Sequence, residues 1–500
     1  MKRVLSVLLF ASCAWPASAT TLQEALVEAY KSNPTITGAR ATQRANDENT
    51  TIQRARGLPT LNATGTYTEF VVIPGGAFSA PKRQVFVGVT GSVPVYQGGA
   101  VSNSIKAADA RIDAGRDTLR DTEASLFANV VAAYMDVIRD EAIVSLNQKQ
   151  VDVLNVNLRA SRDRFQVGDL TRTDVAQSEA RLALQRGQLE QAQANLITSR
   201  ETYIRVVGSP PVDLQAPPPL PGLPGDPQTA VSTALENNPG LRAAQKNREA
   251  ARFDTGVARA TRLPKISVNA QNGYNNYLGS VSSGVPGVSL PQTNDSAQVG
   301  ATLTVPLFQG GSPAAQVRQA QAREGAAIEN ITATERNVVA QTRSAFAAYE
   351  ASNALIVSSQ AAVDANSLSL EGVRAENSVG NRTILDILNA EQELLNSQVN
   401  LVSARRNSYV AGFSLLAAMG HAEARDLGLD AGTLYDPVVN YKRVKGRIFD
   451  WDSDPRPAPV ATRTVSTPAQ TSTITGEPVI APLKTGKPDP AQSTTDPTNK

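Results

Sequence analysis

The 500-residue chain carries the same pattern of residues twice. Two pairs of motifs lie 212 positions apart and two lie 205 apart: VPVYQGG (93–99) with VPLFQGG (305–311), VGDLTRTDV (167–175) with VGNRTILDI (379–387), SNP (32–34) with NNP (237–239), and LPTL (58–61) with LPKI (263–266). Offsets that hold over several motifs indicate two homologous structural units. Both halves of the chain are therefore expected to share one fold.

Each copy contains long stretches that predict helix. Residues 99–165 and 311–377 hold no proline except Pro313, and apolar residues recur in them every seven positions. The first copy shows the repeat in an outgoing and a returning series: Val130, Val137, Val144, Val151 and Leu158, then Val175, Leu182, Leu189, Leu196 and Tyr203. A strict repeat of seven predicts left-handed coiled coils. We expect helical hairpins over 100–207 and 312–420, with rods of about 100 Å.

Two segments of alternating polarity precede each hairpin. Period two over about a dozen residues predicts a strand with one apolar and one polar face. The expected strands are 60–73, 84–97, 265–278 and 296–309. Four strands cannot close a transmembrane barrel, whose smallest members have about eight. On the strands alone two interpretations stay open, an ordinary half-buried sheet or several chains that pool their strands in one barrel.

The chain begins with two cations and an apolar run that ends at Ala17-Ser18-Ala19, which predicts a signal peptide over 1–19 and a mature chain outside the cytoplasm. A rival interpretation is a lipoprotein signal with Cys13 lipidated. Since Cys13 is the only cysteine, a chain that loses it with the signal peptide forms no disulfide. Stability then depends on packing.

The expected organisation follows the repeat. The first unit covers 20–208 and the second 228–420, each with a short helical region (about 21–56 and 228–261) before its strands. Between the units lies a linker over 209–227 with eight prolines, which excludes regular helix. Residues 421–449 are expected to form a periplasmic equatorial segment, and the Pro- and Thr-rich residues 450–500 a disordered tail.

Composition excludes several classes of function. The formal charge of +2 falls to zero when Lys2 and Arg3 leave with the signal peptide, so no nucleic-acid partner is expected. No later segment reaches 18 consecutive apolar residues, so a membrane would be crossed by strands. A mature chain with no cysteine and the single histidine His421 offers neither a catalytic triad nor a His/Cys metal cluster, so we expect no enzyme and no cofactor.

Four motifs follow one another along the chain: the Asn-Pro helix starts, the Leu-Pro before each unit's first strand, the V-P-x-x-Q-G-G crossings and the V-G-x-R-T-I-L-D-I-L turn. In this order they resemble the TolC family of trimeric outer-membrane efflux and secretion channels. The resemblance covers about 20–420. It implies an α+β membrane protein, a trimer whose tandem repeats build a 12-stranded β-barrel continuous with a 12-helix periplasmic tunnel. It also implies outer-membrane lipid around the barrel, and a periplasmic adaptor with an inner-membrane pump or ABC transporter as partners. The alternative is a periplasmic adaptor, which would carry one hairpin instead of two.

The resemblance also implies roles for residues at the hairpin turns. The family's linking arginine matches Arg382, and its partners on the first hairpin match Thr173 and Asp174. The family's gate tyrosine falls on Asn377, a departure from the pattern. We expect Arg382 and Asn377 to bond Asp174 across the hairpins, in links worth about 1 kcal/mol each.

A charged constriction is implied just beyond these links. The outer aspartate ring of the family matches Asp386, and its second ring falls on Asn389, which is neutral. Three copies of Asp386 around an axis would raise one another's pKa and attract cations. The turn glycines Gly168 and Gly380 are expected at the far tip, where an adaptor would make contact.

Overall fold

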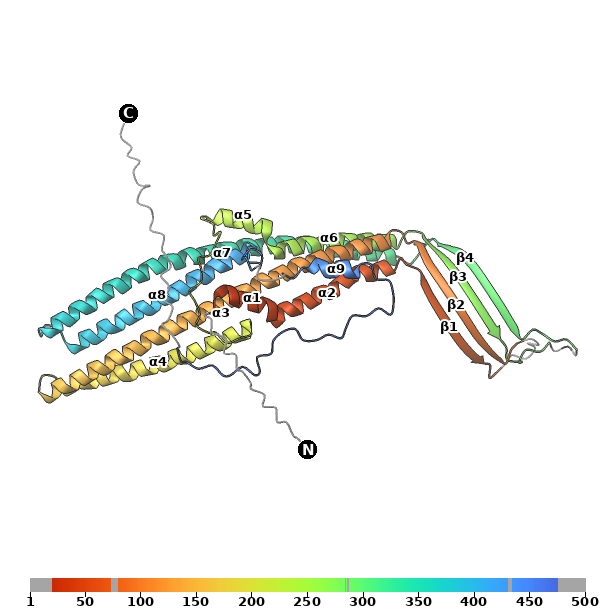
Figure 1. The fold of residues 1–500 in the computed structure, drawn as a ribbon. Coiled ribbons are helices and arrows are strands. Elements are labelled where there is room, and N and C mark those ends of the chain that lie inside the picture. The colour runs from red at the N-terminus through yellow and green to blue at the C-terminus, as the bar shows by residue number, and fades with distance from the viewer. Residues whose placement is uncertain (1–19, 73–79, 284, 286, 430–433, 475–500) are drawn as a thin grey trace, which may run out of the picture.

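The computed structural model describes residues 20–72, 80–283, 285, 287–429 and 434–474. Its elements follow in the order α1 (Leu22–Ser32), α2 (Pro34–Ala55), β1 (Thr60–Glu69), β2 (Arg83–Tyr96), α3 (Ala100–Gln166), α4 (Arg172–Val207), α5 (Pro227–Asn237), α6 (Pro239–Ala260), β3 (Lys265–Asn276), β4 (Thr293–Thr304), α7 (Ser312–Ser378), α8 (Ile384–Ala418) and α9 (Pro437–Val444). The molecule is elongated, with the sheet at one end and the two helical turns at the other (Figure 1).

The tandem repeat is confirmed element by element. Helices α3 and α7 both have 67 residues, and α2 and α6 both have 22. The helical region expected before the strands is broken in each unit, at Asn33-Pro34 and at Asn238-Pro239. Both asparagines cap the second helix through their side chains, and both prolines occupy its first turn, where a missing N–H costs nothing.

The four strands form one antiparallel sheet in the order β1-β2-β3-β4. Its register places apolar residues opposite one another: Leu61 opposite Gly91, Val268 opposite Ala301, and Ile266 opposite Leu303. The polar residues Asn269 and Gln271 likewise lie opposite Gly300 and Gln298, on the other face. Because side chains alternate along a strand, this register gives the sheet one mainly apolar and one mainly polar face, and the apolar face becomes polar at Asn272, Asn276 and Asp295.

The strand ends differ from those expected. Strand β4 spans Thr293–Thr304 and leaves Val305–Phe308 outside the sheet, because Pro306 cannot donate to a ladder and β3 begins at Lys265, opposite Thr304. Pro94 stays within β2 with a bulge before Tyr96. Strand β1 ends at Glu69, before the expected position 73.

Most of the seven-residue repeat is buried between the helices, as expected. Val130, Val137, Leu196 and Tyr203 have no measurable exposure. The core is continuous from α1 through the α3–α4 hairpin. Tyr134 adds a polar tie at its centre, because its hydroxyl is hydrogen-bonded to the carbonyls of Thr20 and Gln215, at 2.9 and 2.7 Å. The Pro-rich linker is thereby held against the start of the first unit.

Part of the segment expected to be disordered is extended chain packed on the helices. Arg200, 8% exposed, donates to the carbonyls of Thr471 and Thr473, and Ile474 packs against the core. Buried donors that need acceptors explain why this part is held. The predicted signal peptide, Cys13 and residues 475–500 lie outside the described residues. Within the described ranges, no helix has both the length and the apolar character needed to span a membrane.

Candidate functional site

The two hairpin turns are built alike. Gly168 and Gly380 adopt φ values of +84° and +82°, in the left-handed region that favours glycine. Their N–H groups donate to the carbonyls of Phe165 and Asn377, each at 3.0 Å. The duplicated glycines thus end α3 and α7 and reverse the chain. An adaptor contact at these glycines stays a prediction.

The two predicted aspartates begin the returning helices. Asp386 accepts hydrogen bonds from the N–H and hydroxyl of Thr383, at 2.9 and 2.8 Å, and Asp174 does the same with Thr171. Each pair is a capping box, in which the threonine side chain accepts in turn from the aspartate N–H. These hydrogen bonds hold the pKa of Asp386 and of Asp174 below the usual range. Any rise in the pKa of Asp386 must therefore come from neighbouring copies.

The expected cross-hairpin pairing of Arg382 with Asp174 is not found. Among the described residues of this protomer, Arg382 pairs with Glu376 of its own hairpin, with Nε 2.7 Å from the carboxylate. Asn377 donates to the Arg382 carbonyl at 2.7 Å instead of bonding Asp174. The reason is local, because Asp174 is occupied by its cap and Glu376 lies on the adjoining last turn of α7. Thr173 is exposed in the first turn of α4.

A link between the hairpins forms at Asn389. The guanidinium of Arg181, on α4, donates to Asn389 Oδ1 at 2.7 Å; Arg181 is partly buried and Asn389 is exposed. Asn389 therefore contacts a cation of the other hairpin, at the position where the resemblance expects a second ring of carboxylates. No local sequence pattern indicates Arg181, because its partner depends on how α4 and α8 pack.

A stronger junction lies two residues further along α8, at Glu391, which is 2% exposed. Its carboxylate accepts from Asn157 of α3, at 3.0 and 3.1 Å, and from Arg374 of α7, at 3.0 Å. Gln150 of α3 lies at 3.5 Å. This carboxylate joins three helices from both hairpins. In the sequence, this junction is indicated only by a charged residue within the buried stripe that includes Ile387 and Leu395.

The first repeat contains the equivalent arginine–glutamate pair, but no third helix in the described part of the chain contacts it. Arg162 and Glu179, 212 positions before Arg374 and Glu391, form an ion pair at 2.6 Å. Their side chains are 56% and 49% exposed, and no residue of the second hairpin contacts them among the described interactions. The repeat thus supplies the ion pair, and only the packing of α8 against α3 converts the second copy into a junction.

The family model for "Outer membrane efflux protein" matches residues 25–209 and 230–421, which are the two structural repeats. The chain belongs to this family. The chain is 33% identical over 431 residues to outer membrane efflux protein BepC of Brucella suis, covering 86% of this chain and 91% of BepC. It is 28% identical over 379 residues to outer membrane protein TolC of Escherichia coli, covering 72% and 75%. Among solved structures, the CmeC outer membrane channel of Campylobacter jejuni superposes with a TM-score of 0.72 at 18% identity, covering 85% and 89%.

The efflux protein is therefore a transport channel of the Gram-negative outer membrane, with the α+β tandem-repeat tunnel fold. Its family is one of transport channels, and the adaptor alternative is not favoured, because two complete strand–strand–hairpin units are present. In the part of the chain that the structure describes, no group of three or more His, Cys, Asp or Glu side chains is placed to hold a metal ion.

Proposed function

We propose that three copies of this chain form one channel that carries small molecules or proteins from the periplasm, or from an inner-membrane pump or ABC transporter, to the exterior. Each copy contributes four strands to a shared barrel and its two hairpins to a tunnel. A periplasmic adaptor docks at the tips near Gly168 and Gly380 and opens the tunnel there.

The unpaired edges and the exposed apolar face of the sheet support this proposal. Its edge strands β1 and β4 have no second neighbour among the described residues, and an unpaired edge is a template for another chain. The apolar face is also bare, with Leu61, Val299 and Leu303 between 61% and 80% exposed. Inside a membrane every backbone N–H and C=O needs a partner, so such a sheet requires copies that close it.

Assembly is tested on the full chain purified from outer membranes in a neutral detergent. Native mass measurement is expected to give three times the mass of the mature chain, and planar bilayers are expected to show discrete channel currents. A monomer that remains folded without channel currents would contradict the proposal.

Arg382 is proposed to contact Thr173 or Asp174 of a neighbouring copy when the tunnel is closed. Within one protomer its pair with Glu376 is half exposed and worth at most about 1 kcal/mol. A channel of three copies loses three such contacts, so we expect Arg382→Ser to raise the open fraction of single channels by about fivefold or more, since 1.4 kcal/mol corresponds to tenfold. An unchanged open fraction would show that Arg382 makes no gating contact.

Asp386 is proposed to form a ring of three carboxylates that binds multivalent cations. Asp386→Asn removes the charge but keeps an oxygen for the Thr383 cap, so a weaker cation block is expected without loss of the turn. Because capping lowers the pKa of Asp386, block of the unmodified channel should be lost only below the pH at which an ordinary aspartate titrates, about 3.9. Asp226→Asn, at the aspartate that caps α5 away from the hairpin turns, is the control. Equal loss of block in both variants would place the constriction elsewhere.

A further inference from the structure

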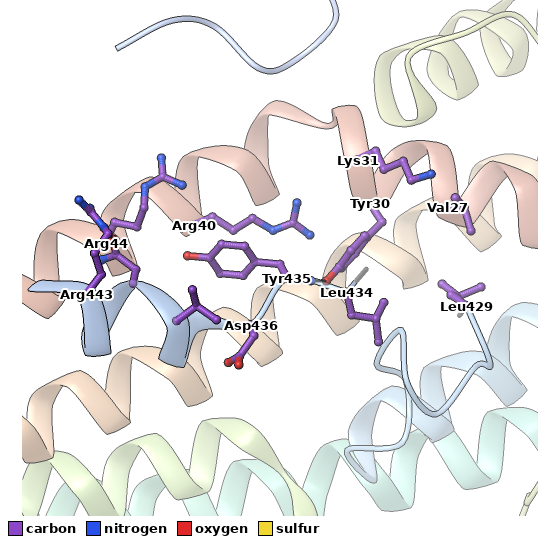
Figure 2. Close-up of a pocket in the computed structure, with 12 residues that line it drawn as sticks. Val27, Tyr30, Lys31, Arg40, Arg44, Leu429, Leu434, Tyr435, Asp436 and Arg443 are labelled. Carbon is purple, nitrogen blue, oxygen red and sulfur yellow. Dashed lines mark hydrogen bonds between the residues drawn. The ribbon is translucent and has the colours of Figure 1, made fainter. Parts of the chain in front are cut away.

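A cavity of about 730 Å³ lies half-way along the molecule, away from both the sheet and the hairpin turns. We call it the equatorial cavity. It is open to solvent on one side and is lined by α1, α2, α9 and the segment that leads into α9 (Figure 2). Its volume falls within the range of small-molecule sites, about 300–1,000 Å³. Nothing in the channel function described above uses this cavity.

Its walls are cationic. Lys31, Arg40, Arg44 and Arg443 line the cavity together with one carboxylate, Asp436. Asp436 is occupied in capping α9, where it accepts from the Val438 N–H at 2.8 Å. Arg443 is neutralised by both oxygens of Asp454, each at 2.7 Å. Among the described residues, the other three cations have no ion pair.

Arg40 is the central cation. Its guanidinium carbon lies 4.1 Å from the centre of the Tyr30 ring and 5.1 Å from that of Tyr435, so two aromatic faces fix its orientation. Figure 2 shows the guanidinium between these rings. Its Nη2 is buried and has no hydrogen-bond partner among the described residues. Glu123 interacts electrostatically with Arg40, but its carboxylate accepts its hydrogen bond from the Ala424 N–H. A buried donor without a partner is costly, and an anion would satisfy it.

The helix packing itself does not need these cations. The second repeat, 205 positions later, has Glu236 where the first has Lys31, Gln245 where it has Arg40, and Glu249 where it has Arg44. Helices α5 and α6 nevertheless have the same lengths as α1 and α2. The positive charge is thus particular to the cavity and is not required by the repeat.

Apart from the amide of Asn440, the remaining walls are apolar. They consist of Val27, Leu429, Leu434 and Val439, beside the faces of the two tyrosines. A small inorganic anion would leave this surface without a partner, whereas a ligand with an apolar body would cover it. We propose that the equatorial cavity binds an organic anion, with its carboxylate or phosphate on Arg40 and Lys31 and its apolar body between Leu434 and Tyr435.

The test uses the full-length channel in a neutral maltoside detergent, titrated calorimetrically with 2-naphthoate and 2-naphthyl phosphate. Both are expected to bind once per protomer with a Kd below about 1 mM. The uncharged 2-naphthylmethanol and inorganic phosphate, which each lack one half of the ligand, should bind at least about tenfold more weakly. The two anionic probes separate a preference for carboxylate from one for phosphate.

Arg40→Gln introduces the residue found at the equivalent position of the second repeat. It is expected to weaken the binding of both anionic probes by about tenfold or more, and Arg44→Gln is a second variant. Arg56→Gln removes an exposed cation at the end of the same helix and should bind as the unmodified protein does. Unchanged binding in Arg40→Gln, equal binding of the uncharged probe, or no saturable binding would each overturn the proposal.

Discussion

Glu391→Ala is expected to raise the open fraction of the channel by about tenfold or more. The substitution removes a buried carboxylate that accepts from Asn157 and Arg374, and so breaks the junction between the two hairpins. Hydrogen bonds to charged groups are worth about 1.5–3 kcal/mol each, and the loss leaves the Asn157 amide unpaired. About 1.4 kcal/mol already corresponds to a factor of ten. Single-channel recording in planar bilayers measures the change.

The first repeat supplies the control. Glu179→Ala removes the equivalent ion pair with Arg162, where both side chains are half exposed and no third helix takes part. Exposed pairs contribute about 0–1 kcal/mol, so little change in the open fraction is expected. If both alanine variants open the channel equally, the effect comes from the loss of an ion pair within a hairpin. Glu391 would then not be a junction between hairpins.

Gly98→Ala is expected to destabilise the protein far more than Gly310→Ala. Both glycines lie where a strand passes into a long helix, with φ of +63° and +59°, so alanine at either costs about 1 kcal/mol in backbone strain. Only Gly98 is also crowded. A Cβ there would lie 2.8 Å from Leu263 Cβ and 3.0 Å from the Ala260 carbonyl, whereas nothing lies within 4 Å at Gly310.

The clash at Gly98 adds about 1–3 kcal/mol, because backbone atoms cannot move aside cheaply. Thermal unfolding of the purified protein should show a larger fall in Tm for Gly98→Ala. The amount of protein recovered in outer membranes should fall in the same order. Equal losses would mean that strain alone matters at these crossings, and that the contact with the α6–β3 connection does not restrict this glycine.

Much of the fold could be predicted because its signals are local and occur twice. Heptad positions such as Val137 and Leu196 are buried whatever the neighbouring hairpin does, since a repeat of seven fixes the face that packs inside each coiled coil. The turn at Gly380 could be located for a similar reason. A left-handed φ favours glycine and the start of a helix favours a threonine cap, and both residues lie close together in the chain.

The partners of the tip residues could not be predicted in this way. Arg382 pairs with Glu376 and Asn389 with Arg181, although the sequence analysis expected Arg382 to reach Asp174. A long side chain can reach several acceptors of similar strength, and the choice depends on which of them is already occupied. Asp174 is occupied by Thr171, a bond that could have been read from the Thr-x-x-Asp pattern.

By itself the sequence determined the duplication, the helical hairpins, the strand segments and the turns, because each depends on residues close together in the chain. Only the tertiary structure decided which copy of a duplicated pair became a junction. Glu179 and Glu391 occupy equivalent positions with equivalent arginines, yet α3 of the other hairpin packs over Glu391, whereas Glu179, among the described residues, pairs only within its own hairpin and stays half exposed. Burial depends on neighbours distant in sequence, and it decides whether a carboxylate is a weak surface pair or a bond between two hairpins.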